Sequence, residues 1–225
     1  MIKLHVDSII KNYGNSQVLT DIYLSCNPGE IIGLLGRNGT GKSTLLKIIF
    51  GSIVADNKFV KIGDKIANGL FGNKNLVSYL PQNHFLPNHV KVSSLISIFC
   101  HKENAIILKE DPFIKPLINK KSTQLSDGER RLLETFLVIF SNAKYILLDE
   151  PFNGIAPIHK KRVKALIKEQ SRHKGFIITD HDYNNILDIA TKTVLIHNGA
   201  TKEIQNLHEL EKWGYISPRS PATRQ

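Results

Sequence analysis

The sequence predicts an α/β fold built on a mostly parallel sheet, and three short, largely apolar runs are the main evidence. They occupy residues 31–35, 145–148 and 176–178, and each is long enough for one strand. Strands that are buried on both faces of a parallel sheet have this composition. After the first run, residues 42–50 carry leucine and isoleucine at helical spacing, and Gly51 is a suitable helix end. A strand, a loop and a helix therefore follow one another here.

The loop between this strand and this helix has a nucleotide-binding pattern. Residues 36–44 read GRNGTGKST and match G-x-x-x-x-G-K-[ST] at every position. Glycines let successive backbone N–H groups surround an anion, and the following helix adds its positive end. The alternative is a glycine-rich turn without a ligand. We predict a phosphate loop made of Gly36, Arg37, Asn38, Gly39, Thr40, Gly41, Lys42, Ser43 and Thr44.

Two side chains of this loop have more specific expected roles. Lys42 can reach the outer phosphates of a nucleotide, and the Ser43 hydroxyl can ligate Mg²⁺. Two acids, Asp149 and Glu150, end the aliphatic run YILL at the carboxyl end of its predicted strand, where α/β sheets bind ligands. Asp149 would hold Mg²⁺ through water, and Glu150 would polarise the water that attacks the terminal phosphate. The alternative is a solvated strand end.

A third motif, LSDGE at residues 125–129, has two interpretations that are compatible. Ser126 and Glu129 have the spacing of a capping box before an apolar helix. The motif also resembles the signature LSGGQ or LSGGE of ATP-binding-cassette (ABC) transporter ATPases, and the resemblance extends from about Lys3 to about Leu210. It implies a phosphate-loop NTPase core, an N-terminal antiparallel β flap and a small inserted helical lobe. It also implies that Ser126 and Gly128 clamp the γ-phosphate bound to the opposite subunit.

The resemblance assigns three further residues. Tyr13 resembles the aromatic residue that stacks on adenine, although an ordinary strand-end tyrosine is the alternative. Gln82, in YLPQ, resembles the loop glutamine that contacts magnesium and moves with the membrane partner. His181, in ITDHD, resembles the switch histidine that contacts the γ-phosphate. The expected catalytic set is Glu150, His181 and Lys42, and the expected metal set is Ser43, Gln82 and Asp149.

The sequence departs from the family pattern at two positions. Asp127 stands where the signature usually has glycine, and it places a carboxylate near a phosphate-binding helix end. Ala156 stands where the family has an aspartate, in a loop that links the two active sites of a dimer. The residues expected to perform the chemistry are intact. These departures leave open slow hydrolysis or a heteromeric partner.

The length of 225 residues suits one ABC ATPase domain at residues 1–213. Its helical lobe would occupy about residues 83–142, and residues 214–225 would form a disordered tail. Alternating residues 2–7 and the stretch 18–25 would pair as the antiparallel flap that carries Tyr13. Asn198 and Gly199 predict a hairpin turn, and a short helix would follow near residues 206–213.

The net charge of +10 is strongly basic, and much of it lies in residues 159–168. Basic runs bind nucleic acid or anionic membranes, but a solvated helix face is the favoured interpretation because Val163, Leu166 and Ile167 keep a helical apolar stripe. No segment is apolar enough to cross a bilayer, and no secretory pattern begins the chain. The two cysteines, Cys26 and Cys100, fit a reducing compartment. We therefore expect a cytoplasmic protein, peripheral on the inner face of the cell membrane.

The expected function is an ATPase subunit that powers a transporter through nucleotide-driven dimer closure, with ATP and Mg²⁺ as cofactors. Its expected partners are a second cassette, in a homodimer or heterodimer, and integral membrane subunits; nucleic acid is not expected. One alternative is a soluble ABC-type regulator of a nucleic-acid or ribosomal process, and another is a cassette that hydrolyses ATP weakly. The ITDHD string and the EPFxGxxP loop most resemble cassettes of branched-chain amino acid uptake or lipopolysaccharide export.

Overall fold

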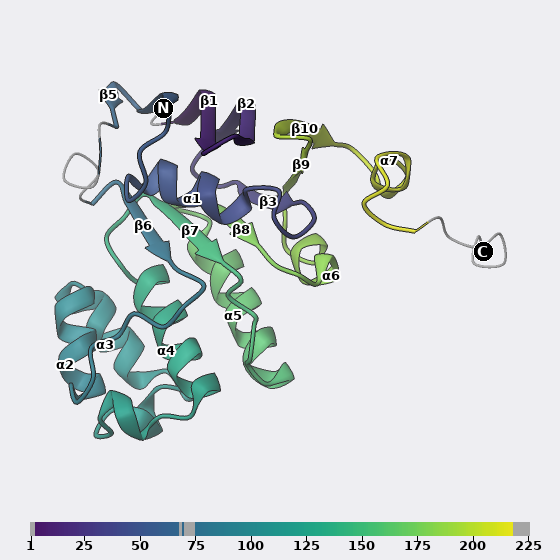
Figure 1. The fold of residues 1–225 in the computed structure, drawn as a ribbon. Helices are drawn as coiled ribbons and strands as arrows, with labels where there is room; N and C mark the ends of the chain where they lie inside the picture. The colour runs from purple at the N-terminus through teal and green to yellow at the C-terminus, as the bar shows by residue number, and fades with distance from the viewer. Residues whose placement is uncertain (1–2, 68, 70–74, 218–225) are drawn as a thin grey trace, which may run out of the picture.

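The protein is described by a computed structural model over residues 3–67, 69 and 75–217. Its described strands form one sheet in the order β5-β4-β1-β2-β10-β9-β3-β8-β7-β6 (Figure 1). The strands are β1 (Leu4–Tyr13), β2 (Ser16–Cys26), β3 (Ile31–Leu35), β4 (Asn57–Ile62), β5 (Lys65–Ile66), β6 (Val77–Leu80), β7 (Tyr145–Asp149), β8 (Gly175–Thr179), β9 (Lys192–His197) and β10 (Ala200–Ile204).

The sheet has a parallel part and an antiparallel part. Strands β9, β3, β8, β7 and β6 run parallel to one another, so their carboxyl ends meet at one edge. Strands β2, β1, β4 and β5 pair antiparallel, and β10 joins the two parts by pairing parallel with β2 and antiparallel with β9. The predicted α/β fold with a mostly parallel sheet and an antiparallel N-terminal flap is confirmed.

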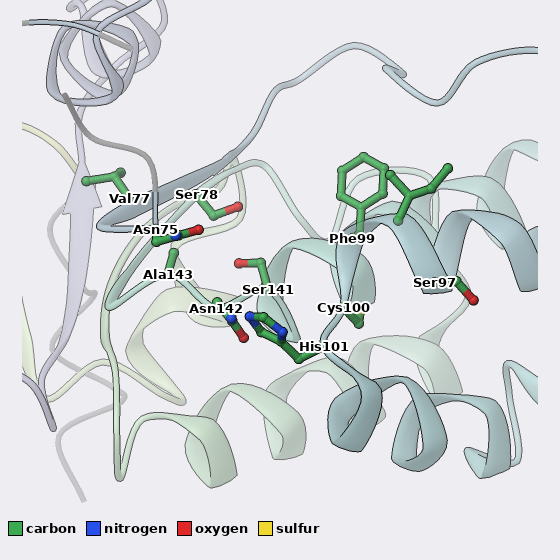
Figure 2. A pocket seen from close by; sticks show the side chains of 11 residues that line it. Asn75, Val77, Ser78, Ser97, Phe99, Cys100, His101, Ser141, Asn142 and Ala143 are labelled. Atoms are coloured by element: carbon green, nitrogen blue, oxygen red, sulfur yellow. The ribbon is translucent and has the colours of Figure 1, made fainter. Parts of the chain in front are cut away.

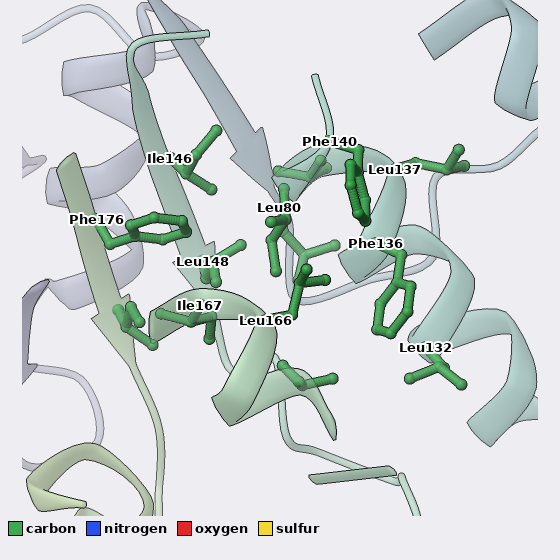
Figure 3. Close-up of a cluster of buried hydrophobic side chains, with 14 of the residues drawn as sticks. Leu80, Leu132, Phe136, Leu137, Phe140, Ile146, Leu148, Leu166, Ile167 and Phe176 are labelled. Carbon is green, nitrogen blue, oxygen red and sulfur yellow. The ribbon is translucent and has the colours of Figure 1, made fainter. Parts of the chain in front are cut away.

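Successive side chains in the central strands point to opposite faces of the sheet, so the core consists of two clusters, one on each face. In β7, Tyr145 and Leu147 point to the cluster that holds helix α1 (Lys42–Phe50), whereas Ile146 and Leu148 point to the opposite cluster. Helices α4 (Asp127–Ile139) and α5 (Pro157–Gln170) fill that opposite face, as Figure 3 shows. Because both faces are covered, all five residues of β7 are buried.

The predicted helical lobe is present beside this core. It contains α2 (Val92–Phe99), α3 (Lys102–Glu110), short 3₁₀ turns at Lys115–Leu117 and Ser122–Gln124, and α4. Figure 1 shows these helices together, next to α5. The lobe is tied to α5 by an ion pair in which Arg162 Nη2 lies 2.7 Å from Asp111 Oδ2. Its outer surface exposes Ile98, Ile106 and Ile107.

The remaining helices follow the last parallel strands. Helix α6 (Tyr183–Leu187) comes after β8, and α7 (Leu207–Lys212) comes after the β9–β10 hairpin. Asn198 and Gly199, with φ of 49° and 76°, form the predicted hairpin turn, since its central residues both need positive φ. Helix α5 buries Val163, Leu166 and Ile167 and carries the basic run, as predicted. Among the described helices, none has the length and apolarity needed to span a membrane.

The C-terminal segment follows α7. The predicted disordered tail begins at Gly214, but Tyr215 and Ile216 donate backbone hydrogen bonds to the Leu210 carbonyl and pack against the core. Residues 218–225 lie outside the described residues. Backbone hydrogen bonds to α7 therefore continue past residue 213, and the domain boundary at that residue stays a prediction.

Candidate functional site

A cleft of about 500 Å³ brings together most of the residues selected from the sequence. It lies where the phosphate loop, the flap and the carboxyl ends of β6, β7 and β8 meet. Segments that lie far apart in the sequence therefore share one site. This is expected at the edge of an α/β sheet where the carboxyl ends of its strands meet and ligands bind. The cleft is lined by Tyr13, Val18, Asn38, Gly39, Gly41, Lys42, Ser43, Thr44, Gln82, Glu150 and His181.

The backbone conformation of the phosphate loop depends on its glycine residues. Gly39 and Gly41 have φ of 81° and 95°, in the left-handed region that glycine adopts without strain. A Cβ on Gly41 would lie 2.7 Å from Leu19 Cδ2 and 2.8 Å from Val18 Cγ1, so strand β2 of the flap packs directly on the loop. Helix α1 starts immediately afterwards at Lys42. Its free N–H groups therefore face the loop.

Lys42 lies inside the curve of this loop. Its ammonium donates to the carbonyl oxygens of Gly36 at 2.6 Å and Arg37 at 3.1 Å, and the residue is 8% exposed. Burial lowers the pKa of Lys42, and the nearby carboxylates of Glu150 and Asp149 oppose that effect. The side chain is therefore held by backbone acceptors within the lining of the cleft.

Asp149 ends β7 and is fixed by two hydroxyl groups. Tyr79 donates to Oδ2 at 3.0 Å and Thr179 donates to Oδ1 at 2.8 Å, from the neighbouring strands β6 and β8. Burial, followed by the charge of Asp149 and its hydrogen bond, raises the pKa of Tyr79, which therefore stays a donor at neutral pH. Asp149 is 1% exposed and its carboxylate orientation is set on both sides.

Glu150 occupies a strained backbone position next to it. Its φ is 55°, which non-glycine residues adopt rarely and at a cost, and the residue is 4% exposed. Its carboxylate accepts from Gln82 Nε2 at 3.0 Å and lies 2.8 Å from His181 Nε2. The three residues, chosen from separate motifs, thus meet at one carboxylate. His181 remains half-exposed at the mouth of the site.

Arg131 was not selected from the sequence, yet it ties the signature helix α4 to this strained turn. It donates to the carbonyl oxygens of Asp149 at 2.6 Å, Glu150 at 3.0 Å and Pro81 at 2.6 Å. Burial lowers the pKa of Arg131, and the carboxylate of Glu134 is the first of several charges that counter it. Its guanidinium fork suits such a convergence of carbonyls.

Ser126 and Gly128 lie at the N-terminus of α4 and are not among the described residues that line the cleft. The predicted capping box is confirmed: Ser126 Oγ accepts from Glu129 N at 3.2 Å, and Glu129 Oε2 accepts from Ser126 N at 2.8 Å. A Cβ on Gly128 would lie 3.0 Å from the Gly154 carbonyl oxygen, so this helix tip abuts the loop before α5. Asp127 is exposed in the first turn of α4.

The start of the phosphate loop has a partner that was not predicted. Arg37 donates to the carbonyl oxygen of Gly214 at 2.6 Å. The Tyr215 hydroxyl is hydrogen-bonded to the backbone of Gly36, and the Tyr215 ring meets Tyr183 of α6 edge-on at 6.2 Å. The C-terminal segment thus contacts both the phosphate loop and the helix that follows His181. Gly36, Arg37 and Thr40 lie outside the cleft lining.

Figure 2 shows a second hollow, of about 380 Å³, which is lined in part by the start of β6. Its lining includes Val77 and Ser78 at the start of β6, Cys100 and His101 between α2 and α3, and Asn142 after α4. No residue selected for phosphate or metal binding lies among those that line it. Most of the selected residues line the first cleft instead.

Comparisons with known proteins identify the family to which the chain belongs. The family model described as ABC transporter matches residues 19–153. The lipopolysaccharide export system ATP-binding protein LptB of Haemophilus influenzae is 31% identical over 210 residues, which cover 87% of each chain. The LptB of Escherichia coli K12 is 30% identical over 213 residues, 88% of each chain. Lipopolysaccharide export is one of the two transport classes that the short loops resemble.

Solved structures give the same result for the fold. The structure of an ATP-binding subunit of an ABC transporter superposes with a TM-score of 0.83 at 19% identity, over 98% of this chain and 96% of that one. The ATP-binding cassette MJ1267 gives a TM-score of 0.79 at 24% identity, over 94% of both chains. The chain therefore belongs to the ABC transporter family, as an ATP-binding subunit whose ATPase activity energises a transporter.

Proposed function

We propose that two copies of this chain bind two ATP molecules between them. Each nucleotide would lie in the cleft of one copy and against Ser126 and Gly128 of the other. The proposal rests on the separation of two parts of the expected site. The phosphate loop lines the cleft, whereas the capped N-terminus of α4 lies outside the lining of the same cleft. A helix N-terminus favours an anion, so the tip of the second copy would complete the site. Because one chain carries both halves, it is complementary to itself.

Within each site we assign the hydrolytic roles to the residues around Glu150. Glu150 would polarise the attacking water, Lys42 would neutralise charge on the outer phosphates, and His181 would contact the γ-phosphate. The contacts of Glu150 with Gln82 and His181, together with its burial, support this arrangement. Tyr13 is 47% exposed at the cleft mouth, where its ring would stack on adenine.

The oxygen-rich donor set fits Mg²⁺. The Ser43 hydroxyl, the Gln82 amide and the Asp149 carboxylate supply hard ligands, and among the described residues no cluster of three His, Cys, Asp or Glu side chains would favour another metal. Mg²⁺ keeps several waters, so Asp149, whose oxygens each already accept one hydrogen bond, would act through water. Bound Mg²⁺ would neutralise phosphate charge; Ser43, Gln82 and Asp149 would orient it.

We further propose that the helical lobe meets an integral membrane subunit at the cytoplasmic face of the cell membrane. Ile98, Ile106 and Ile107 support this placement, since they are 72%, 59% and 57% exposed on adjacent helices α2 and α3. Large exposed apolar side chains that gather in one place mark interaction surfaces. The lobe begins just after Gln82, so contact here would reach the site by a short path.

The Glu150→Gln variant tests the dimer. Without the carboxylate, water attack slows while ATP binding persists, so the variant should elute as a dimer on gel filtration with ATP and Mg²⁺ and as a monomer without nucleotide. The Lys42→Ala variant is the control, because it should remain monomeric under both conditions. A Glu150→Gln protein that stays monomeric, or that hydrolyses ATP at the wild-type rate, would contradict the proposal.

A further inference from the structure

Glu134, on α4, is a fully buried carboxylate that has no role in the function proposed above. It is 0% exposed, and a carboxylate so placed needs hydrogen-bonding partners. Its Oε1 accepts from the backbone N–H groups of Phe85 at 3.0 Å and Leu86 at 3.4 Å. Its Oε2 lies 2.8 Å from Nδ1 of His84. Glu134 is therefore fastened to three consecutive residues that begin two positions after Gln82.

Neighbouring residues of α4 hold the same stretch of chain. Arg130 Nη2 donates to the Leu86 carbonyl oxygen at 2.6 Å, and Arg131 Nη1 donates to that of Pro81 at 2.6 Å. Residues 130, 131 and 134 share one face of the helix by the i, i+3 and i+4 spacing. This face of α4 therefore holds the chain by hydrogen bonds on both sides of Gln82.

These contacts connect α4 with the part of the site where hydrolysis is proposed to occur. The Gln82 side chain donates to Glu150 at 3.0 Å, so a shift of the segment after Gln82 would move the partner of that carboxylate. Arg131 also binds the carbonyl oxygens of Asp149 and Glu150. One helix therefore carries Ser126 at its tip and, two turns later, the contacts that orient Gln82 and Glu150.

We propose that Glu134 is a positioning residue for ATP hydrolysis: it fastens the segment His84–Phe85–Leu86 to α4 and so fixes Gln82 against Glu150. This proposal rests on the proposed function, since it takes Gln82 and Glu150 as members of the hydrolytic site. Glu134 touches neither the phosphate loop nor the cleft lining among the described residues. Its loss should lower kcat and leave the KM for ATP nearly unchanged.

The test compares Glu134→Ala and Glu134→Gln with Asp111→Asn. Asp111 is a matched control: its side chain is 3% exposed and binds Arg162 at 2.7 Å, on the same lobe but away from Gln82. Loss of hydrogen bonds to a charged group should lower kcat about ten-fold in Glu134→Ala. Glu134→Gln retains one acceptor oxygen and should lose less, and Asp111→Asn should keep the wild-type kcat even where its Tm falls.

A double-mutant cycle with Gln82→Ala separates positioning from a general loss of stability. If Glu134 acts through Gln82, Glu134→Gln should reduce kcat much less in the Gln82→Ala background than in the wild type. Additive losses in the two backgrounds, or a wild-type kcat for folded Glu134→Ala, would overturn the inference. If Glu134→Ala does not fold, Glu134→Gln and its cycle decide the matter. Wild-type hydrolysis by Glu150→Gln would instead overturn the proposed function.

Discussion

At the scale of single residues, the site depends on how firmly its carboxylates are held. Asp149 accepts one hydroxyl at each oxygen, from Tyr79 and Thr179. Glu150 sits at a φ of 55°, and Arg131 binds its carbonyl oxygen and that of Asp149. Pre-oriented groups stabilise developing charge without reorganising during the reaction. Under the proposed function, hydrolysis would therefore depend on neighbours that have no assigned contact with phosphate.

Replacement of Tyr79 by phenylalanine tests this dependence. The variant keeps the ring that packs on Phe50 but leaves Asp149 Oδ2 without its donor. A lost hydrogen bond to a charged group costs about 1.5–3 kcal/mol, so Asp149 should orient Mg²⁺ less well and the Mg²⁺ concentration for half-maximal ATPase activity should rise about ten-fold. A Mg²⁺ titration of ATPase activity measures this; Tyr23→Phe, on the exposed flap, is the control. An unchanged midpoint would contradict the assigned role.

The site residues that the sequence predicts lie in local motifs, whereas the residues that only the structure reveals act through contacts between distant segments. Lys42, Asp149 and Glu150 lie in local motifs whose chemistry shows in adjacent residues. Tyr79 reaches Asp149 only because β6 pairs with β7, with Tyr79 opposite Leu147. Arg131 reaches Glu150 only because α4 packs under β7. Such contacts are set by strand pairing and helix packing, and nothing in the neighbouring sequence specifies them.

At the scale of elements, the proposed function gives α4 a second role that begins at the residue of its cap. Ser126 caps the helix through Glu129 N, and the proposed function places the same side chain against the nucleotide of a second copy. A helix cap alone is a local structural device. The two functions can be separated because α7 has an equivalent cap, Asn206, which accepts from Glu209 N at 3.1 Å and lies away from the cleft lining.

We therefore expect Ser126→Ala and Asn206→Ala to differ in association although they lose similar caps. Each should lower the free energy of unfolding by about 1 kcal/mol, measured by urea denaturation. In the Glu150→Gln background, only Ser126→Ala should weaken the ATP-dependent dimer, measured by sedimentation velocity. If both variants dimerise as readily as their parent, α4 would be only a capped helix.

Sequence reasoning succeeded for the elements with strong local signals. Helix α1 and its glycine end, the capping box of α4 and the Asn198–Gly199 turn were predicted, since each depends on residues next to one another. Strands β4 and β5 and helix α6 were not. Strand β5 has two residues and α6 has five, too few to show a period, and β4 is stabilised by its pairing with β1. The packing of Tyr215 against the phosphate loop joins segments that are far apart in the sequence and meet only in the folded protein.

At the scale of the whole molecule, the arrangement of the sheet separates two functional surfaces. The carboxyl ends of β6, β7 and β8 and the phosphate loop form the cleft, whereas the lobe carries the capped tip of α4 and the exposed isoleucines of α2 and α3. If the tip of α4 completes the cleft of a second copy, as proposed, each site becomes complete only on association. Association and hydrolysis should therefore be coupled.

Mixing two inactive variants tests this central claim most directly. Lys42→Ala lacks a working phosphate loop and Ser126→Arg lacks a working helix tip, so each should be inactive alone. In an equal mixture, each heterodimer would combine the intact phosphate loop of one copy with the intact tip of the other, so one of its two sites should be complete. A phosphate-release assay should then show activity well above the sum of the separate proteins. Activity equal to that sum would contradict a site shared between two copies.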